Sequence, residues 1–454
     1  MTTIKINRQN SIQLPYAIEI LYRTGVKDIE LEFCGQGNEA VSFSQITETV
    51  YKILDYESKF GIWLRNIPFC VMNENSIDHI LPPTKDFIGE KTDLCRSCRY
   101  FDTCSGFPRG YFKNYGDEEL SPIKDIPSEI MIEIESRCNF NCSFCFNKIS
   151  FAQKGRNFRS IDTNYAKKII KHLVKIGIPS VRFTGGEPLL RSDLIDLICY
   201  AKDLGLYVTL NTNASLITTV MAKKFKGIVD NVLISIESYD DEKEKKITGF
   251  PYALKKKEEA VNLLKQEGIT TVRVGTVITK ELIDNLDKMG NFIFNLPSDE
   301  WEFYRPINHT KKKSFLTSKL IEILAEKIIY WREKEDKKVS IANAIPFCAI
   351  KDLNKMNSIC RGGFPEEGHN RLVIDSRNFV KPYYFIDKNI GSPLNILKAW
   401  HHPFIEKMKN LNFLPKECQN CNFRFKCCGG SRYAAKLASN DWKAPDPLAD
   451  YKNL

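Results

Sequence analysis

The run EIMIEIESRCNFNCSFCFN extends from Glu129 to Asn147. Its first seven residues have the apolar pattern of a strand, and a C-x3-C-x2-C array follows at once, formed by Cys138, Cys142 and Cys145. Soft thiolates hold iron–sulfur units, and three of them would leave one iron of a [4Fe–4S] cluster open. A zinc site or chance cysteines are the alternatives, but structural zinc usually takes four ligands. No fourth Cys or His lies nearby in the sequence, which favours the cluster.

Strand-like runs recur after this array, and amphipathic helical runs separate several of them. We predict strands at residues 129–135, 180–185, 207–213, 231–237, 271–278 and 300–306, and helices at 163–177 and 192–205. Alternating strands and helices indicate a parallel sheet. Six units are too few for a closed eight-stranded barrel, so we predict an α/β fold with a partial (β/α)6 TIM-type barrel. Its chemistry would lie at the carboxyl ends of the strands, where the cysteine array lies.

Cysteine-rich regions flank this core on both sides. Residues 1–66 predict two βα units and a closing strand, and a cysteine-rich stretch and a proline-containing linker follow. We predict three domains: residues 1–120, a βα region with a four-thiol metal site; residues 121–315, the barrel core; and residues 316–454, a C-terminal domain with another iron–sulfur site.

Composition limits the classes of protein that the chain can represent. The 454 residues suffice for two or three domains with real cores. The net charge is +10, but lysines mix with glutamates in helical runs such as 253–268, so a solvated helix face is the favoured interpretation and nucleic-acid binding the less favoured one.

We expect neither a signal peptide nor a membrane span, and hence a cytoplasmic protein. Fifteen cysteines in such a compartment indicate metal binding or catalysis rather than disulfides.

The cysteine array, with Phe144 before its third cysteine, resembles the radical S-adenosylmethionine (radical SAM) superfamily. The resemblance covers about residues 125–310. It implies that S-adenosylmethionine (SAM) binds the open iron and that one electron cleaves it to a 5′-deoxyadenosyl radical, which abstracts a substrate hydrogen. An external one-electron donor such as flavodoxin or ferredoxin is then expected.

Three further motifs support this resemblance. TGGEPLL (184–190) is similar to the family's GGEP motif, which binds the cofactor amine; NTNAS (211–215) and ISIES (234–238) are similar to later strand ends. Glycines allow close backbone approach, and a carboxylate suits an ammonium. The resemblance implies that the cofactor-binding residues are Phe144, Gly185, Gly186, Glu187, Asn211 and Ser235. One departure is Thr248, which stands where an Arg is expected, with Lys245 or Lys246 as substitutes.

The C-terminal region resembles the SPASM-type extension of this superfamily, which carries auxiliary [4Fe–4S] clusters. The resemblance rests on CQNCNFRFKCCGG (418–430) and on ICRGG (359–363). Three positions where that extension has cysteines hold Tyr383, Ser431 and Ala449 instead. The usual ligands therefore suffice for one cluster but not for two.

The chain also resembles itself in two places. NIPFCVM (66–72) precedes CRSCRYFDTCSG (95–106), and AIPFCAI (344–350) precedes CQNCNFRFKCCGG. We infer two equivalent four-thiol sites, one with Cys70, Cys95, Cys98 and Cys104, the other with Cys348, Cys418, Cys421 and Cys427. Cys360 or Cys428 is an alternative member of the second site. Structural zinc is the alternative at both, and [4Fe–4S] is favoured beside a radical core.

The favoured function is a radical SAM oxidoreductase or maturase that modifies a peptide or protein. An open partial barrel would admit a bulky chain, and auxiliary clusters would accept an electron from it. The alternative is synthesis of a small molecule or cofactor, as in the haem and PQQ pathways. A third and least favoured hypothesis is a non-catalytic iron–sulfur electron-transfer protein. The intact GGEP motif argues against it. Tyr384 stands where sulfatase-maturing relatives have an acid, which argues against that activity.

Overall fold

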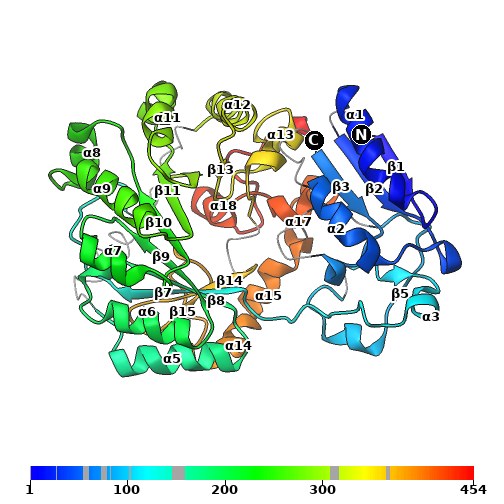
Figure 1. Ribbon diagram of the computed structural model, residues 1–454, viewed down its shortest axis with the longest axis horizontal. Coiled ribbons are helices and arrows are strands. Elements are labelled where there is room, and N and C mark those ends of the chain that lie inside the picture. The colour runs from blue at the N-terminus through cyan, green and yellow to red at the C-terminus, as the bar shows by residue number, and fades with distance from the viewer. Residues whose placement is uncertain are drawn as a thin grey trace. The chain divides into compact units, whose positions relative to one another are not determined.

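The structure is a computed structural model, and it divides into two compact units, Met1–Asp125 and Ile126–Leu454 (Figure 1). It describes residues 2–26, 28–54, 61–72, 79–81, 83–101, 104–145, 159–306, 316–363 and 369–454. The further division of the second unit near residue 315 stays a prediction.

The first unit is built on a parallel sheet in sequence order. Its strands are β1 (Thr2–Ile6), β2 (Asp28–Phe33), β3 (Gly61–Arg65) and β4 (Ile80–Leu81), and helices α1 (Leu14–Arg23) and α2 (Phe43–Leu54) connect the first three. The predicted pair of βα units with a closing strand is therefore confirmed. A short antiparallel pair, β5 (Gly89–Glu90) and β6 (Phe107–Pro108), and helix α3 (Tyr111–Tyr115) follow.

The second unit contains a nine-stranded sheet in the order β13-β12-β11-β10-β9-β8-β7-β14-β15. The bounds are β7 (Glu129–Glu135), β8 (Ser180–Gly185), β9 (Tyr207–Thr212), β10 (Asn231–Ser235), β11 (Thr271–Val277), β12 (Glu300–Tyr304), β13 (Val339–Ile341), β14 (Arg371–Ile374) and β15 (Val380–Lys381). All pairs are parallel except the β14–β15 hairpin. The six predicted strands are confirmed as neighbours, β7 to β12, of a partial barrel.

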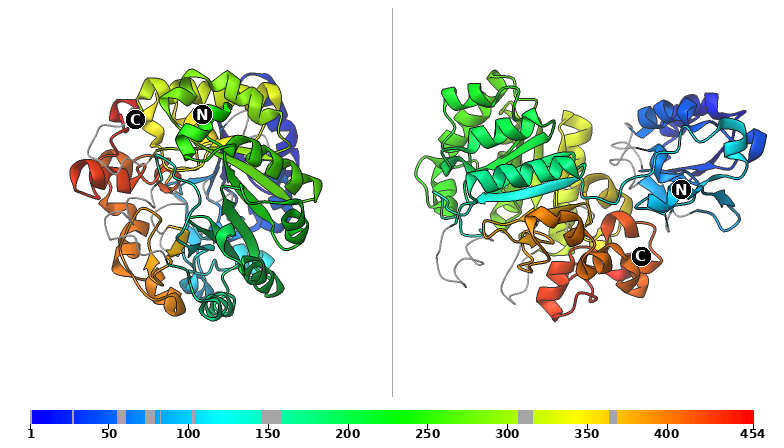
Figure 2. Two further views of the ribbon diagram at one scale, coloured as in Figure 1. Left: turned by 90° about the vertical axis from the view of Figure 1, so that its left-hand side faces the viewer. Right: turned by 90° about the horizontal axis from the view of Figure 1, so that it is seen from below.

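Helices connect these strands and lie outside the curved sheet (Figure 2). They are α5 (Thr163–Lys175), α6 (Leu194–Asp203), α7 (Thr219–Phe225), α8 (Asp241–Thr248), α9 (Ala253–Gln266), α10 (Lys280–Asp284), α11 (Leu286–Phe294) and α12 (Ser318–Glu335). Helix α5 illustrates why they form. Asp162 caps its first turn, and Ala166, Ile169, Ile170 and Leu173 form one buried stripe against the sheet.

The C-terminal part of the second unit consists of short helices. They are α13 (Leu353–Ile359), α14 (Ile396–Trp400), α15 (Pro403–Lys409), α16 (Lys416–Gln419), α17 (Arg424–Cys427) and α18 (Arg432–Ser439). A buried pair ties this part to the barrel, because Arg305, just after β12, donates to both oxygens of Asp446 at 2.7 and 2.9 Å. Within the described residues, no helix is both long enough and apolar enough to span a bilayer.

Candidate active site

The three-cysteine loop follows the carboxyl end of β7 and is held from the side by helix α8. The last carbonyl groups of a helix have no partner within it. Here the carbonyl of Thr248 accepts from the backbone N–H of Asn141 at 2.7 Å, and that of Ile247 accepts from Ser143 at 3.0 Å. The stretch in which an Arg was expected therefore fixes the backbone around Cys142.

The two glycines of the GGEP turn bring the end of β8 directly against this loop. The N–H groups of Gly186 and Glu187 donate to the carbonyls of Glu135 and Arg137, both at 2.7 Å. A Cβ on Gly186 would lie 2.1 Å from the Arg137 carbonyl oxygen, and one on Gly185 would lie 2.1 Å from that of Glu135. Glycine is thus required here by the loop itself, besides its predicted role toward the cofactor.

Glu187 is fully buried and joins the ends of β8 and β9. Its carboxylate accepts from the Thr212 hydroxyl at 2.7 Å, from the Asn213 N–H at 2.7 Å and from the Leu189 N–H at 3.0 Å. Burial raises the pKa of this carboxyl, and the three donors oppose that rise. Its predicted contact with the cofactor ammonium stays a prediction.

Asn213 is a site residue that sequence reasoning missed. Its Nδ2 donates to Asn139 Oδ1 at 2.8 Å inside the cysteine loop, and lies 3.9 Å from the Cys138 sulfur. Asn211, the residue chosen from the same N-T-N run, accepts from Arg182 at 3.4 Å instead. The second asparagine of the motif therefore lies beside the cysteines, and the contact of Asn211 with the cofactor stays a prediction.

The remaining predicted cofactor residues lie at the same edge of the sheet. Strands β7, β8, β9 and β10 are consecutive parallel neighbours, so their carboxyl ends meet there. Ser235 ends β10 and is exposed, and Phe144 is half-buried beside Cys145. Their contacts with adenine and ribose stay predictions.

Lys257 of α9 is a buried cation, and it offers a positive charge of the kind that the expected Arg would supply. It is 1% exposed, forms an ion pair with the fully buried Glu244, and its Nζ lies 5.2 Å from the centre of the Phe140 ring. Burial raises the pKa of Cys142 to about 12, and Lys257 opposes that rise. Lys257 thus places a positive charge near the thiol at which a cluster would bind.

The residues proposed as substitutes for that Arg lie elsewhere. Thr248 is buried and its hydroxyl donates to the Glu244 carbonyl at 2.8 Å. Lys245 and Lys246 are exposed on α8, and Lys245 pairs with Glu242 in solvent. Neither lysine matches the buried position of Lys257.

The donor set fits a cluster with one open iron. Burial raises the pKa of Cys138 to about 11 and that of Cys142 to about 12, so these thiols keep their protons at neutral pH until a metal displaces them. Together with Cys145 they make three thiols on one loop, which would bind three irons of a [4Fe–4S] unit. The nearby Lys257 charge suits the negative charge of such a unit.

A Lys257→Met variant tests the buried pair. Removal of one partner leaves Glu244 buried and uncompensated, so we expect the second unit to lose about 3–5 kcal/mol of unfolding free energy. The double variant Lys257→Met/Glu244→Gln should recover part of that loss, because the remaining side chain is neutral. Urea unfolding monitored by circular dichroism measures both. A single variant as stable as the wild type would contradict the assigned pair.

The two predicted thiol quartets each gather around a cavity. In the first unit Cys70, Cys95, Cys98 and Cys104 line one small pocket. In the second unit a similar pocket is lined by Cys348, Cys418, Cys421 and Cys427. The alternatives Cys360 and Cys428 are not among the residues that line it. Their thiols donate to backbone carbonyls instead, that of Cys360 to Asn343 at 3.6 Å and that of Cys428 to Phe425 at 3.3 Å.

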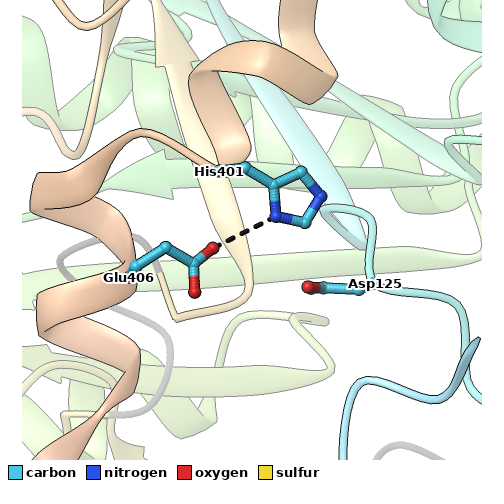
Figure 3. Close-up of side chains that lie close together, drawn as sticks. All are labelled: Asp125, His401 and Glu406. Carbon is cyan, nitrogen blue, oxygen red and sulfur yellow. Dashed lines mark hydrogen bonds and ion pairs between the residues drawn. The ribbon is translucent and has the colours of Figure 1, made fainter. Parts of the chain in front are cut away.

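The adjacent histidines His401 and His402 lie at the start of α15. His402 caps the helix by accepting from the Phe404 N–H at 3.1 Å. His401 is half-exposed and bonds Glu406 at 3.1 Å, as Figure 3 shows. An exposed pair of this kind contributes little to stability.

The sequence is similar to those of known proteins. Residues 132–297 match the family model of the Radical SAM superfamily. The chain is 23% identical over 340 residues to the PqqA peptide cyclase of Bradyrhizobium diazoefficiens, covering 71% of this chain and 86% of that protein. It is 24% identical over 342 residues to the AdoMet-dependent heme synthase of Nitratidesulfovibrio vulgaris, covering 70% and 91%.

A solved structure has the same fold. Streptococcus suis SuiB, bound to the precursor peptide SuiA, superposes with a TM-score of 0.56 at 17% identity, over 71% of this chain and 75% of that one. The cysteine loop, the GGEP turn, the partial barrel and the family match agree with one another. Residues 132–297 therefore form a radical SAM domain, and these similarities support a radical SAM enzyme with a SPASM-like C-terminal extension.

Proposed function

We propose that this enzyme is a maturase that abstracts a hydrogen atom from a peptide or protein. The observation that carries the proposal is the position of Cys138, Cys142 and Cys145 at the carboxyl end of β7, pressed against the GGEP turn. These thiols would hold the [4Fe–4S] cluster that the family uses together with SAM. When bound, cluster and SAM supply an organic radical able to remove hydrogen from carbon.

The chain's own residues prepare the site for that chemistry. Asn213 and the carbonyls at the end of α8 fix the loop, and the buried Lys257 supplies a positive charge beside Cys142. The exposed Ser235 and the GGEP backbone face the edge of the sheet where the cofactor would lie. A fixed cation in a low-dielectric site acts more strongly than one in water.

Two observations support a peptide substrate. The relatives include a PqqA peptide cyclase, and SuiB was solved with a precursor peptide. In the described part of the chain the sheet is not closed, since β13 and β15 form its two ends, which leaves the barrel open along one side. An extended chain needs such an opening to reach the strand ends. The similarity to the AdoMet-dependent heme synthase favours synthesis of a small molecule as the second candidate.

The SPASM-like extension would hold an auxiliary [4Fe–4S] cluster on Cys348, Cys418, Cys421 and Cys427. Four protein ligands leave no open iron, so we assign it to electron transfer: it would accept the electron that a substrate radical gives up when its new bond forms. A flavodoxin or ferredoxin in the cytoplasm would supply the electron that starts each turnover.

Co-expression tests the substrate class. The enzyme is produced with each short peptide encoded beside its gene, and peptide masses are compared with those from the Cys142→Ala variant. We expect one peptide to lose two hydrogens, as a new cross-link requires, only with the wild-type enzyme. Unchanged peptides, combined with SAM cleavage that is stimulated by a porphyrin, would contradict the maturase and support the second candidate.

A further inference from the structure

The first unit contains a group of four thiols that lies outside the barrel. Cys70 lies in a 3-10 turn directly after β3, Cys95 and Cys98 lie in and after a second such turn, and Cys104 follows. All four are partly buried and line one cavity. Apolar groups, including Pro68, Phe101 and Phe107, form much of its wall.

The second unit repeats the construction of this site. In each unit a helix leads into a parallel strand, α2 into β3 and α12 into β13, and an I-P-F-C turn follows the strand (Figure 1). Both turns form a 3-10 helix that starts from a proline of nearly the same backbone angles, φ −66° and ψ 142° at Pro68, φ −62° and ψ 137° at Pro346. The first thiol of each quartet lies in that helix.

The contacts to the last thiol of each quartet are also equivalent. The backbone N–H of Phe69 donates to the Cys104 sulfur, and that of Phe347 donates to the Cys427 sulfur at 3.5 Å. The N–H of Cys104 donates to the carbonyl four residues earlier at 2.8 Å, and so does that of Cys427. Peptide groups at equivalent positions therefore hold the last thiol of the quartet in both units.

An aromatic pair involves the phenylalanine of the I-P-F-C turn in each unit. Phe69 stacks on Tyr100 with ring centres 4.5 Å apart, and Phe347 meets Phe423 at 5.6 Å. Tyr100 and Phe423 each lie two residues after the second cysteine of the C-x2-C pair. Two sites that share a turn, a sulfur contact and a neighbouring aromatic pair are expected to bind the same kind of group.

The spacing of the sulfurs favours an iron–sulfur cluster over a single zinc ion. A tetrahedral zinc with thiolates at 2.3 Å would place the sulfurs about 3.8 Å apart. Among the residues that the structure describes, no three cysteine sulfurs all lie within 4.8 Å of one another. A [4Fe–4S] cluster needs wider spacing, because each thiolate binds a different iron.

We propose that Cys70, Cys95, Cys98 and Cys104 hold a [4Fe–4S] cluster in the N-terminal unit, equivalent to the one in the C-terminal extension. All four irons would carry a protein thiolate, so the cluster exchanges electrons and does not bind substrate. The enzyme then contains three clusters, one reactive and one in each flanking region.

Metal analysis of the full chain tests this assignment without reference to activity. Iron, sulfide and zinc are measured after anaerobic reconstitution of the wild type, of Cys98→Ala/Cys104→Ala and of a control, Cys34→Ala/Cys199→Ala, whose cysteines lie outside all three sites. We expect about twelve irons in the wild type and the control, about eight in the first variant, and no zinc. An unchanged iron content in the first variant, or loss of zinc in place of iron, would overturn the proposal.

Two further samples keep the test decisive if that variant does not fold. Cys98→Ser preserves the size of the side chain and should lose the same four irons. The variant Cys421→Ala/Cys427→Ala removes the C-terminal site alone, so a stoichiometric zinc that remains in it would lie in the N-terminal unit. That result also would refute the cluster.

Discussion

Cys142→Ala should reduce the formation of 5′-deoxyadenosine from SAM and dithionite to the level seen without enzyme. Cys142 is the middle thiol of the loop, and the loop around it is fixed by hydrogen bonds from Asn141 and Ser143 to α8. Among the residues that the structure describes, the other cysteine groups line two different pockets and offer no replacement sulfur on this loop. A cluster with two thiolates left would not persist.

The variant should lose the reactive cluster and nothing else. Iron content should fall by about four per chain relative to the wild type, with the flanking sites still loaded. Cys199→Ala is the matched control, since Cys199 lies on α6 and away from all three thiol groups, and it should retain full cleavage. Cofactor cleavage that persists in Cys142→Ala would remove Cys138, Cys142 and Cys145 from the catalytic role.

The barrel strands could be predicted from sequence because each is an apolar run followed by a turn or a helix. The thiol quartets could be predicted because the chain repeats a motif, and the two cavities gather the eight cysteines so inferred. The choice between Cys348 and Cys360 was left open, since spacing along the chain says nothing about which thiol turns inward. Backbone carbonyls near Cys360 already accept its S–H.

The exposure of Lys257 was predicted wrongly from the sequence. The interpretation of residues 253–268 as a solvated helix face is correct for Lys255 and Lys256, which are exposed, and wrong for Lys257, which is buried. Helical spacing could have predicted its burial. Lys257 lies three residues after Leu254 and four before Val261, on the buried stripe of α9. Its partner Glu244 lies on a different helix, so no local pattern could reveal the pair.

Gly186→Ala should disable the active site although it adds a single methyl group. The new Cβ would lie 2.1 Å from the carbonyl oxygen of Arg137 and 2.6 Å from that of Ser136. Both are backbone atoms of the chain that leads into Cys138, so the clash can be relieved only by separating the GGEP turn from the cysteine loop. We expect loss of about four irons per chain and of 5′-deoxyadenosine formation. Overpacking of this kind should lower the unfolding free energy by about 1–3 kcal/mol.

Gly268→Ala separates this local effect from general destabilisation. Gly268 has a φ of +84° with open space where a Cβ would lie, so alanine there costs about 1–2 kcal/mol through backbone strain alone. The two variants should therefore unfold at similar urea concentrations, yet only Gly186→Ala should lose the reactive cluster. If Gly186→Ala cleaves SAM at the wild-type rate, the GGEP turn can separate from the cysteine loop without loss of activity. The close approach of β8 to the cysteines would then serve the fold and not the chemistry.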